Sequence, residues 1–143
     1  MPHEIARLPE HSLDLIVLIS VLQYLTAAGA SALFLLFHRL LKRGGVLIVS
    51  DVIPLEGTAA TDAVALLRFG CINRFFLAAI WGLIRTSLSS YWRLRSRLGL
   101  TRYTKAAMLE KLNAAGFDAR LAPTNIGHNQ ARWTYCAHPR ETV

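Results

Sequence analysis

The sequence contains little cysteine, and its cysteines are not arranged as a disulfide or metal framework. Among 143 residues there are two, Cys71 and Cys136, with no CxxC pair and no His or Cys neighbours at metal-ligand spacing. Small disulfide scaffolds and zinc sites need several closely spaced ligands. We therefore predict free, buried thiols and no metal site.

Long apolar runs are also absent. No stretch of 18 or more consecutive apolar residues occurs, and the most hydrophobic uncharged segment, Phe75–Ile84, has about half the length that a bilayer requires. Charged residues, among them Arg7 and Asp14, interrupt the first 14 positions before any signal-peptide core could form. These absences predict a cytoplasmic protein.

Acidic residues are few, and basic ones are concentrated in one segment. The net charge is +7, and hydrophobic residues make up 53% of the chain, which predicts one compact domain over residues 1–143. Between positions 59 and 105 a single acid, Asp62, opposes eight basic residues: Arg68, Arg74, Arg85, Arg93, Arg95, Arg97, Arg102 and Lys105. This segment therefore contains the whole charge excess.

The first half of the sequence predicts a strand–helix–strand unit. Leu13–Leu22 and Val46–Val52 are nearly continuous in aliphatic residues, as in parallel strands covered by helices on both faces. Between them, Thr26–Lys42 has helical periodicity, with Thr26 as N-cap and Gly44-Gly45 as the stop.

The second half predicts a helical insertion followed by one helix and two strands. Thr104 is a suitable N-cap for the late helix and Gly116 a suitable residue to follow it. The expected elements are helical 59–98 with breaks near 70–73 and 87–90, a helix over 104–115, and strands over 117–123 and 132–137. The fold class is therefore α/β, with residues 59–99 as a basic helical insertion.

This order, together with three motifs, resembles the C-terminal half of class I S-adenosylmethionine (SAM)-dependent methyltransferases. The motifs are the acidic-x-x-x-Leu-Pro loop at Glu4–Pro9 before a strand, the turn Arg39–Gly45, where Arg43 replaces the usual proline, and the Tyr103–Phe117 helix ending in Ala-Gly-Phe. The resemblance covers nearly the whole chain. It implies a partial Rossmann-like sheet, strands four to seven, with the insertion after strand five.

The glycine-rich cofactor loop of that family cannot be placed in this sequence. Nine glycines are present, but none forms a G-x-G-x-G motif. The resemblance therefore implies half of a SAM site, completed by an N-terminal half or by a longer gene product. It also implies a hydrophobic sheet edge that this half, or a partner, would cover.

The resemblance further implies cofactor-binding residues. Glu4 matches the acidic residue that accepts a hydrogen bond from the adenine amino group, and Ile5 matches the residue that packs beside that ring. Glu4 could equally be a solvated terminal residue. Ser20, Val21 and Gln23 follow the fourth strand, where the family lines the methionine and sulfonium end of SAM. Ligands of open α/β sheets bind at the carboxyl ends of strands, which supports this placement independently.

Two residues are catalytic candidates. Asp51 ends the second strand and could orient a substrate nucleophile, act as a general base, or simply cap the following turn. His128, in the polar turn 124–130 that should return to the same edge, could accept a proton or simply be solvated. Methyl transfer from a sulfonium depends mainly on positioning, so neither role is obligatory.

The basic insertion is expected to set substrate choice as a lid. Its aromatic residues, Trp81 and Tyr91 among them, alternate with arginines. They could form the core of a two-helix lid, or an amphipathic cover that contacts a membrane surface or an apolar, anionic substrate. Nucleic acid is not an expected partner because the segment is too apolar. The predicted function is methyl transfer to a small, apolar or lipid-like molecule; the alternative is a non-catalytic, truncated module that binds a membrane or partner.

Overall fold

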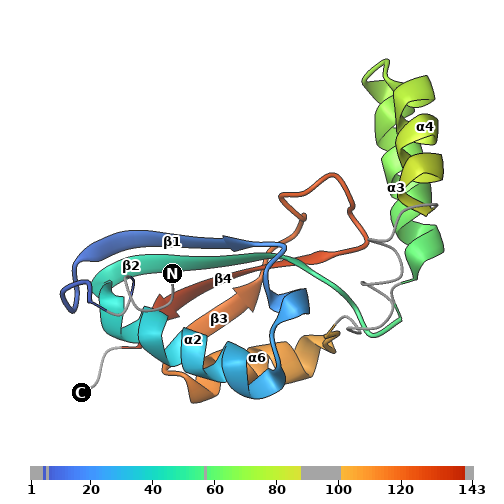
Figure 1. The fold of residues 1–143 in the computed structure, drawn as a ribbon. Coiled ribbons are helices and arrows are strands. Elements are labelled where there is room, and N and C mark those ends of the chain that lie inside the picture. The colour runs from blue at the N-terminus through green and yellow to red at the C-terminus, as the bar shows by residue number, and fades with distance from the viewer. Residues whose placement is uncertain (1–4, 6, 57, 88–100, 141–143) are drawn as a thin grey trace.

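A computed structural model describes residues 5, 7–56, 58–87 and 101–140, and shows a mixed four-stranded sheet with helices (Figure 1). The strand order is β1-β2-β4-β3, with β1 parallel to β2 and the other pairs antiparallel. The elements are β1 (Leu13–Ile19), the 3-10 turn η1 (Leu22–Tyr24), α2 (Ala27–Leu40), β2 (Leu41–Val52), α3 (Ala59–Ile72), α4 (Phe76–Ser87), α6 (Lys105–Ala114), β3 (Phe117–Leu121) and β4 (Trp133–Pro139).

The β1-α2-β2 unit confirms the predicted parallel crossover. Val17 pairs with Ile48 in the parallel register. The Thr26 hydroxyl caps α2 by accepting a hydrogen bond from the Gly29 N–H. The predicted glycine stop is wrong. The helix ends at Leu40, and Gly44 and Gly45 lie inside β2, because Leu41 already pairs with Leu13 at the start of the sheet.

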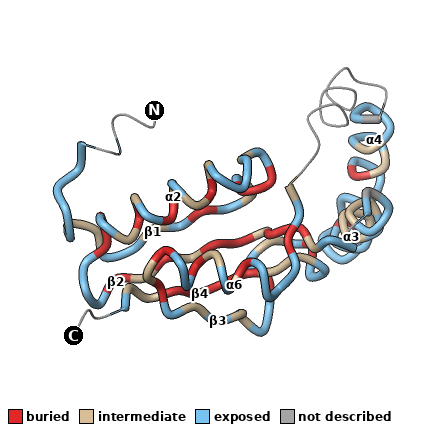
Figure 2. Tube along the Cα trace, turned by 90° about the horizontal axis from the view of Figure 1, so that it is seen from below, coloured by how far each residue is buried: buried red, intermediate tan, exposed pale blue. Residues whose placement is uncertain are grey.

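The core lies between one face of the sheet and the two helices α2 and α6. Both helices lie on the same side of the sheet in Figure 1, and the buried segments of Figure 2 concentrate where they meet it. Phe34 of α2, Leu47 of β2, Met108 of α6 and Tyr135 of β4 are all 0% exposed. This layer holds the folded unit together.

The opposite face of the sheet is apolar and open at β1. Leu15, Val17 and Ile19 alternate along the strand and are 54%, 46% and 47% exposed. The prediction that this strand is covered on both faces is therefore wrong for the described residues. The strand also ends at Ile19, not Leu22, because the chain turns at Ser20 into η1.

The last three elements confirm the sequence prediction. The Thr104 hydroxyl accepts the Ala107 N–H and caps α6, and Gly116 follows the helix with a φ of 90°. Strands β3 and β4 pair antiparallel, with Ala119 opposite Ala137. They extend the sheet beyond β2.

Helices α3 and α4 form a hairpin that projects away from the sheet (Figure 1). The first break, predicted near 70–73, lies at residues 73–75, just after α3 ends at Ile72. Residues 88–90 of the second predicted break, like residues 88–99 of the insertion as a whole, lie outside the described residues. Of the two alternatives for the insertion's aromatic residues, core packing is wrong for Phe76 and Trp81, which are 42% and 67% exposed. Cys71 of this hairpin is exposed and Cys136 is half-buried, so both thiols are free as predicted but neither is fully buried.

Within the described ranges, no helix combines the length and the apolar character needed to span a bilayer.

Candidate functional site

Two residues with unusual backbone geometry lie together at the carboxyl ends of the parallel strands. Ser20 directly follows β1 and Asp51 is the penultimate residue of β2, and both have left-handed φ angles, 57° and 65°. Such angles are costly for residues other than glycine and persist only where surrounding contacts enforce them. The Ser20 N–H donates to the Ser50 carbonyl at 3.3 Å, which ties the two strand ends together.

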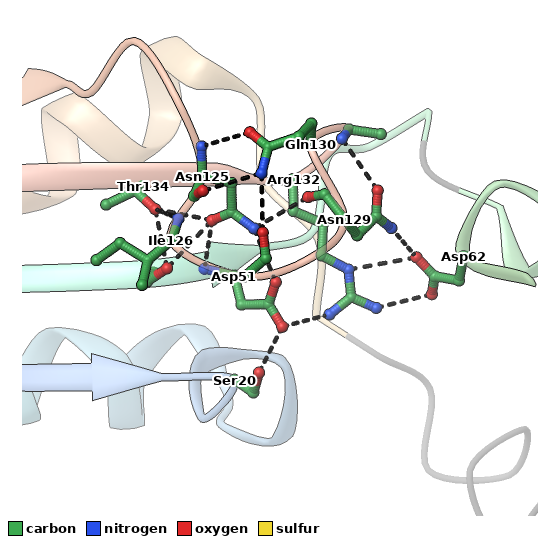
Figure 3. Close-up of polar contacts among 12 residues, drawn as sticks. Ser20, Asp51, Asp62, Asn125, Ile126, Asn129, Gln130, Arg132 and Thr134 are labelled. Carbon is green, nitrogen blue, oxygen red and sulfur yellow. Dashed lines mark hydrogen bonds and ion pairs between the residues drawn. The ribbon is translucent and has the colours of Figure 1, made fainter. Parts of the chain in front are cut away.

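The Asp51 carboxylate is the centre of a polar cluster (Figure 3). It accepts hydrogen bonds from Ser20 Oγ at 2.5 Å, Asn125 Nδ2 at 3.1 Å and Arg132 Nη1 at 2.8 Å. Its side chain is 13% exposed. The structure therefore brings together two residues that the sequence marked, Ser20 and Asp51, and shows that Asp51 contacts side chains instead of only capping a turn.

Electrostatics keeps Asp51 ionised at neutral pH. Burial raises its pKa, but the hydrogen bond from Ser20 and the charge of Arg132, with further hydrogen bonds, lower it below the ordinary value of 3.8 overall. A carboxylate with a lowered pKa is a weak general base. The geometry therefore favours an orienting or charge-stabilising role over proton abstraction.

Arg132 joins the site to the hairpin. Its Nη1 contacts Asp51 while its Nη2 donates to Asp62 Oδ2 at 2.7 Å, and Asn129 Nδ2 donates to Asp62 Oδ1 at 2.7 Å. Asp62 lies in the first turn of α3. The base of the hairpin is thus attached to the end of β2, beside the candidate site.

The loop between β3 and β4 returns to this edge, as predicted. Asn125, 6% exposed, accepts hydrogen bonds from the hydroxyls of Ser50 and Thr134 at 3.1 and 2.7 Å. A Cβ atom added to Gly127 would lie 2.9 Å from Asp51 Oδ1, so the loop backbone approaches the carboxylate closely. Sequence reasoning missed Asn125 and Arg132. The one signal for Asn125 was its place in the polar turn 124–130, whereas Arg132 was predicted only as the first residue of a strand.

The remaining sequence-predicted residues occupy different surroundings. His128 is exposed, and the centroid of its ring lies 5.6 Å from the ring centroid of Phe69 in α3. Val21 is 38% exposed, whereas Gln23 is 7% exposed, and within the described chain its Oε1 has no hydrogen-bond partner. Ile5 is 40% exposed, and Glu4 lies outside the described residues.

Across the described residues, no group of three or more His, Cys, Asp or Glu side chains is placed to hold a metal ion.

Comparison with solved structures identifies proteins of similar fold. Human N-acetylserotonin methyltransferase in complex with SAM matches at 17% identity and a TM-score of 0.55, over 96% of this chain and 32% of that one. The magnesium protoporphyrin IX methyltransferase of Synechocystis PCC 6803, with bound SAH, matches at 19% identity and a TM-score of 0.52. The match covers 95% of this chain and 48% of that one. A methyltransferase of calicheamicin biosynthesis, also SAH-bound, matches at 17% identity and a TM-score of 0.54. The match covers 95% of this chain and 32% of that one.

This chain therefore spans about a third to a half of the length of these structures. No protein-family model matches the sequence, and no curated protein matches it. The likeness thus concerns the arrangement of strands and helices.

Proposed function

We propose that this chain, which has the fold of the C-terminal half of a class I methyltransferase, supplies half of a SAM-dependent active site. The observation that carries the proposal is the Ser20–Asp51 pair at the carboxyl ends of adjacent parallel strands. Open α/β sheets bind their ligands at that edge. Both residues have strained backbone angles, which concentrate at functional sites.

The chemistry of these residues suits the cofactor. SAM supplies a methyl group on a positively charged sulfonium, and Asp51 places an ionised carboxylate at the same edge as Ser20 and the half-exposed Val21. The buried Gln23 Oε1 lacks a partner among the described residues, so it could accept a hydrogen bond from an added group. In this proposal Ser20, Val21 and Gln23 line the cofactor, and Glu4 and Ile5 contact its adenine ring.

The acceptor that we propose is an apolar or lipid-like small molecule. The α3–α4 hairpin begins next to Asp51 through the Arg132–Asp62 pair, and Phe69 and His128 lie against each other where the hairpin meets the loop. An apolar acceptor would pack on such aromatic side chains. His128 is the candidate proton acceptor there, and Asp51 orients the acceptor molecule.

A non-catalytic module is the second candidate. The observation in its favour is the open face of β1, together with a sequence that has no G-x-G-x-G motif. Such a chain would bind a partner or surface without binding SAM.

One experiment separates the two candidates. The reading frame upstream of the Met1 codon should encode a strand, a G-x-G-x-G turn and an acidic residue about 20 positions further on. The longer product should then transfer a labelled methyl group from SAM to lipid extracts. A stop codon directly upstream, with no SAM affinity in the chain, would support the non-catalytic module instead.

A further inference from the structure

We propose that the distal part of the α3–α4 hairpin is a docking surface for an anionic lipid bilayer. This inference does not depend on the proposed methyl transfer. It rests on an unusual concentration of apolar exposure. Of the eighteen large hydrophobic residues that are exposed in the described chain, eight belong to this hairpin.

The apolar side chains cluster around the hairpin's turn. Ile72 and Leu77, on either side of the turn, are 72% and 80% exposed, and Trp81 is 67% exposed one helical turn further along α4. The turn itself is tight, with the Phe75 N–H donating to the Gly70 carbonyl at 2.8 Å. The helices contact each other at Gly70 and Ala79, so their outward sides remain uncovered.

Positive charge surrounds this apolar surface. Residues 58–87 contain three arginines, Arg68, Arg74 and Arg85, and one acid, Asp62. Asp62 lies at the base of the hairpin and is paired with Arg132, so it does not neutralise Arg74 in the turn or Arg68 about one helical turn before it. An apolar helical surface with aromatic and arginine side chains is the combination that binds anionic membrane interfaces, where long arginine side chains reach the headgroups.

Other occupants fit less well. A second copy docked by two-fold symmetry would bring the three arginines of each hairpin toward those of the other, and like charges repel. A preceding half of the domain would cover the exposed face of β1, but the distal turn points away from the sheet (Figure 1). A bilayer matches both the apolar side chains and their positive surroundings.

Vesicle flotation with the full chain tests the proposal. The chain should bind vesicles of phosphatidylcholine mixed with phosphatidylglycerol, bind pure phosphatidylcholine much more weakly, and lose binding as salt is added. Arg74→Gln, at the turn itself, should weaken binding about fivefold, because one arginine near an anionic surface contributes about that factor. Leu77→Glu should weaken it at least tenfold, because a charge replaces a highly exposed leucine at the contact.

Matched controls locate the contact. Leu35→Glu changes a leucine on α2 that is 57% exposed, Arg120→Gln changes an exposed arginine on β3, and Val17→Glu changes the open sheet face. All three should bind vesicles like the unchanged chain. If Val17→Glu abolishes binding and Leu77→Glu does not, the sheet face is the lipid contact and the proposal is wrong. If the unchanged chain dimerises without lipid and Leu77→Glu is monomeric, a second copy covers the hairpin and the proposal is also wrong.

A label on Cys71 gives a local readout that folding defects alone would not reproduce. Cys71 is exposed and directly precedes Ile72, so in a Cys136→Ser background it can carry an environment-sensitive fluorophore. Anionic vesicles should shift its emission to the blue, and Leu77→Glu should remove the shift. Vesicle binding with no change in the emission of this label would overturn the proposal.

Discussion

At the scale of single residues, Arg132 is the side chain on which the site most depends. It is 12% exposed and pairs with both Asp51 and Asp62. Arg132→Leu would remove the guanidinium that both partly buried carboxylates contact, which typically costs about 3 kcal/mol or more of unfolding free energy. Denaturant unfolding of this variant measures the loss.

An exposed ion pair provides the matched comparison. Lys42 contacts Asp14 at 2.8 Å, but the two side chains are 48% and 79% exposed. Lys42→Leu should therefore change the unfolding free energy by less than about 1 kcal/mol. Equal losses in the two variants would show that the Arg132 bridge contributes no more than a surface pair.

Tyr135 predicts a loss of stability at high pH. Its side chain is 0% exposed, and burial raises its pKa from 10.0 to about 12. Because the pKa of Tyr135 is raised in the folded state, its protonated hydroxyl contributes fully to the free energy of unfolding below pH 10. This contribution, about 2–3 kcal/mol in total, is lost as the pH rises toward 12. Unfolding free energies of the unchanged chain and Tyr135→Phe should therefore diverge above pH 10.

The same variant has a second expected effect at neutral pH. Among the described residues, the Tyr135 hydroxyl has no hydrogen-bond partner. Tyr135→Phe removes this buried polar group and should stabilise the chain by about 1 kcal/mol. Tyr103 also has a raised pKa, so part of the alkaline loss should persist in Tyr135→Phe. An unchanged pH profile would contradict the role given to Tyr135.

The site could be predicted only in part from the residues. Asp51 and Ser20 could be identified because each lies at the carboxyl end of a strand that the sequence predicts from its run of apolar residues. Arg132 and Asn125 were not, because their partnership with Asp51 spans 81 and 74 positions of sequence. A local pattern contains no information about which distant polar residues meet.

At the scale of elements, the contact between α3 and α4 depends on one glycine. A Cβ atom added to Gly70 would lie 3.0 Å from the Ala79 Cβ and 3.3 Å from the Phe76 Cα, whereas one added to Gly82 would meet nothing within 4 Å. Gly70→Leu should therefore separate the helices and raise hydrogen exchange throughout the hairpin. Gly82→Ala should leave exchange unchanged or slow it, since alanine is the better helix former by about 1 kcal/mol.

The core between α2, α6 and the sheet should respond little to a change in the hairpin. The hairpin is attached at its base and contributes little to the core between α2, α6 and the sheet. The unfolding midpoint of that core should therefore shift little in Gly70→Leu. A large shift would show that the hairpin and the sheet unfold as one unit.

Element boundaries were predictable where a local signal decides them. The threonine caps of α2 and α6 were identified correctly because a hydroxyl before an apolar periodic run has a local role. The end of α2 was not, because pairing of Leu41 with Leu13 begins the strand before the two glycines. A long-range contact overrode the local stop signal.

At the scale of the whole molecule, the sequence predicted more burial than this chain achieves. Continuous apolar strands indicated helices on both faces of the sheet, but α2 and α6 lie on the same face (Figure 1). The aromatic composition of the insertion likewise allowed a packed core, yet Phe76 and Trp81 in its described part are exposed. Composition shows how apolar a segment is without showing what covers it.

The open face predicts association of the chain alone. Leu15, Val17 and Ile19 form an exposed apolar row on an edge strand, a surface prone to pairing with other chains. Sedimentation should show self-association that rises with concentration, and Val17→Lys should reduce it. A chain that stays monomeric at high concentration would contradict this view of the β1 face.

In the proposed function, the carboxyl ends of β1 and β2 border a SAM site. The most direct test is to titrate the longer product, isotope-labelled and carrying both halves of the proposed site, with S-adenosylhomocysteine and to follow the backbone amide resonances of residues 1–143. Resonances should shift at residues 20–23, at Asp51 and in the loop 125–128, and Ser20→Ala should weaken all of these shifts. Shifts confined to other surfaces, or none up to millimolar ligand, would contradict the proposed site.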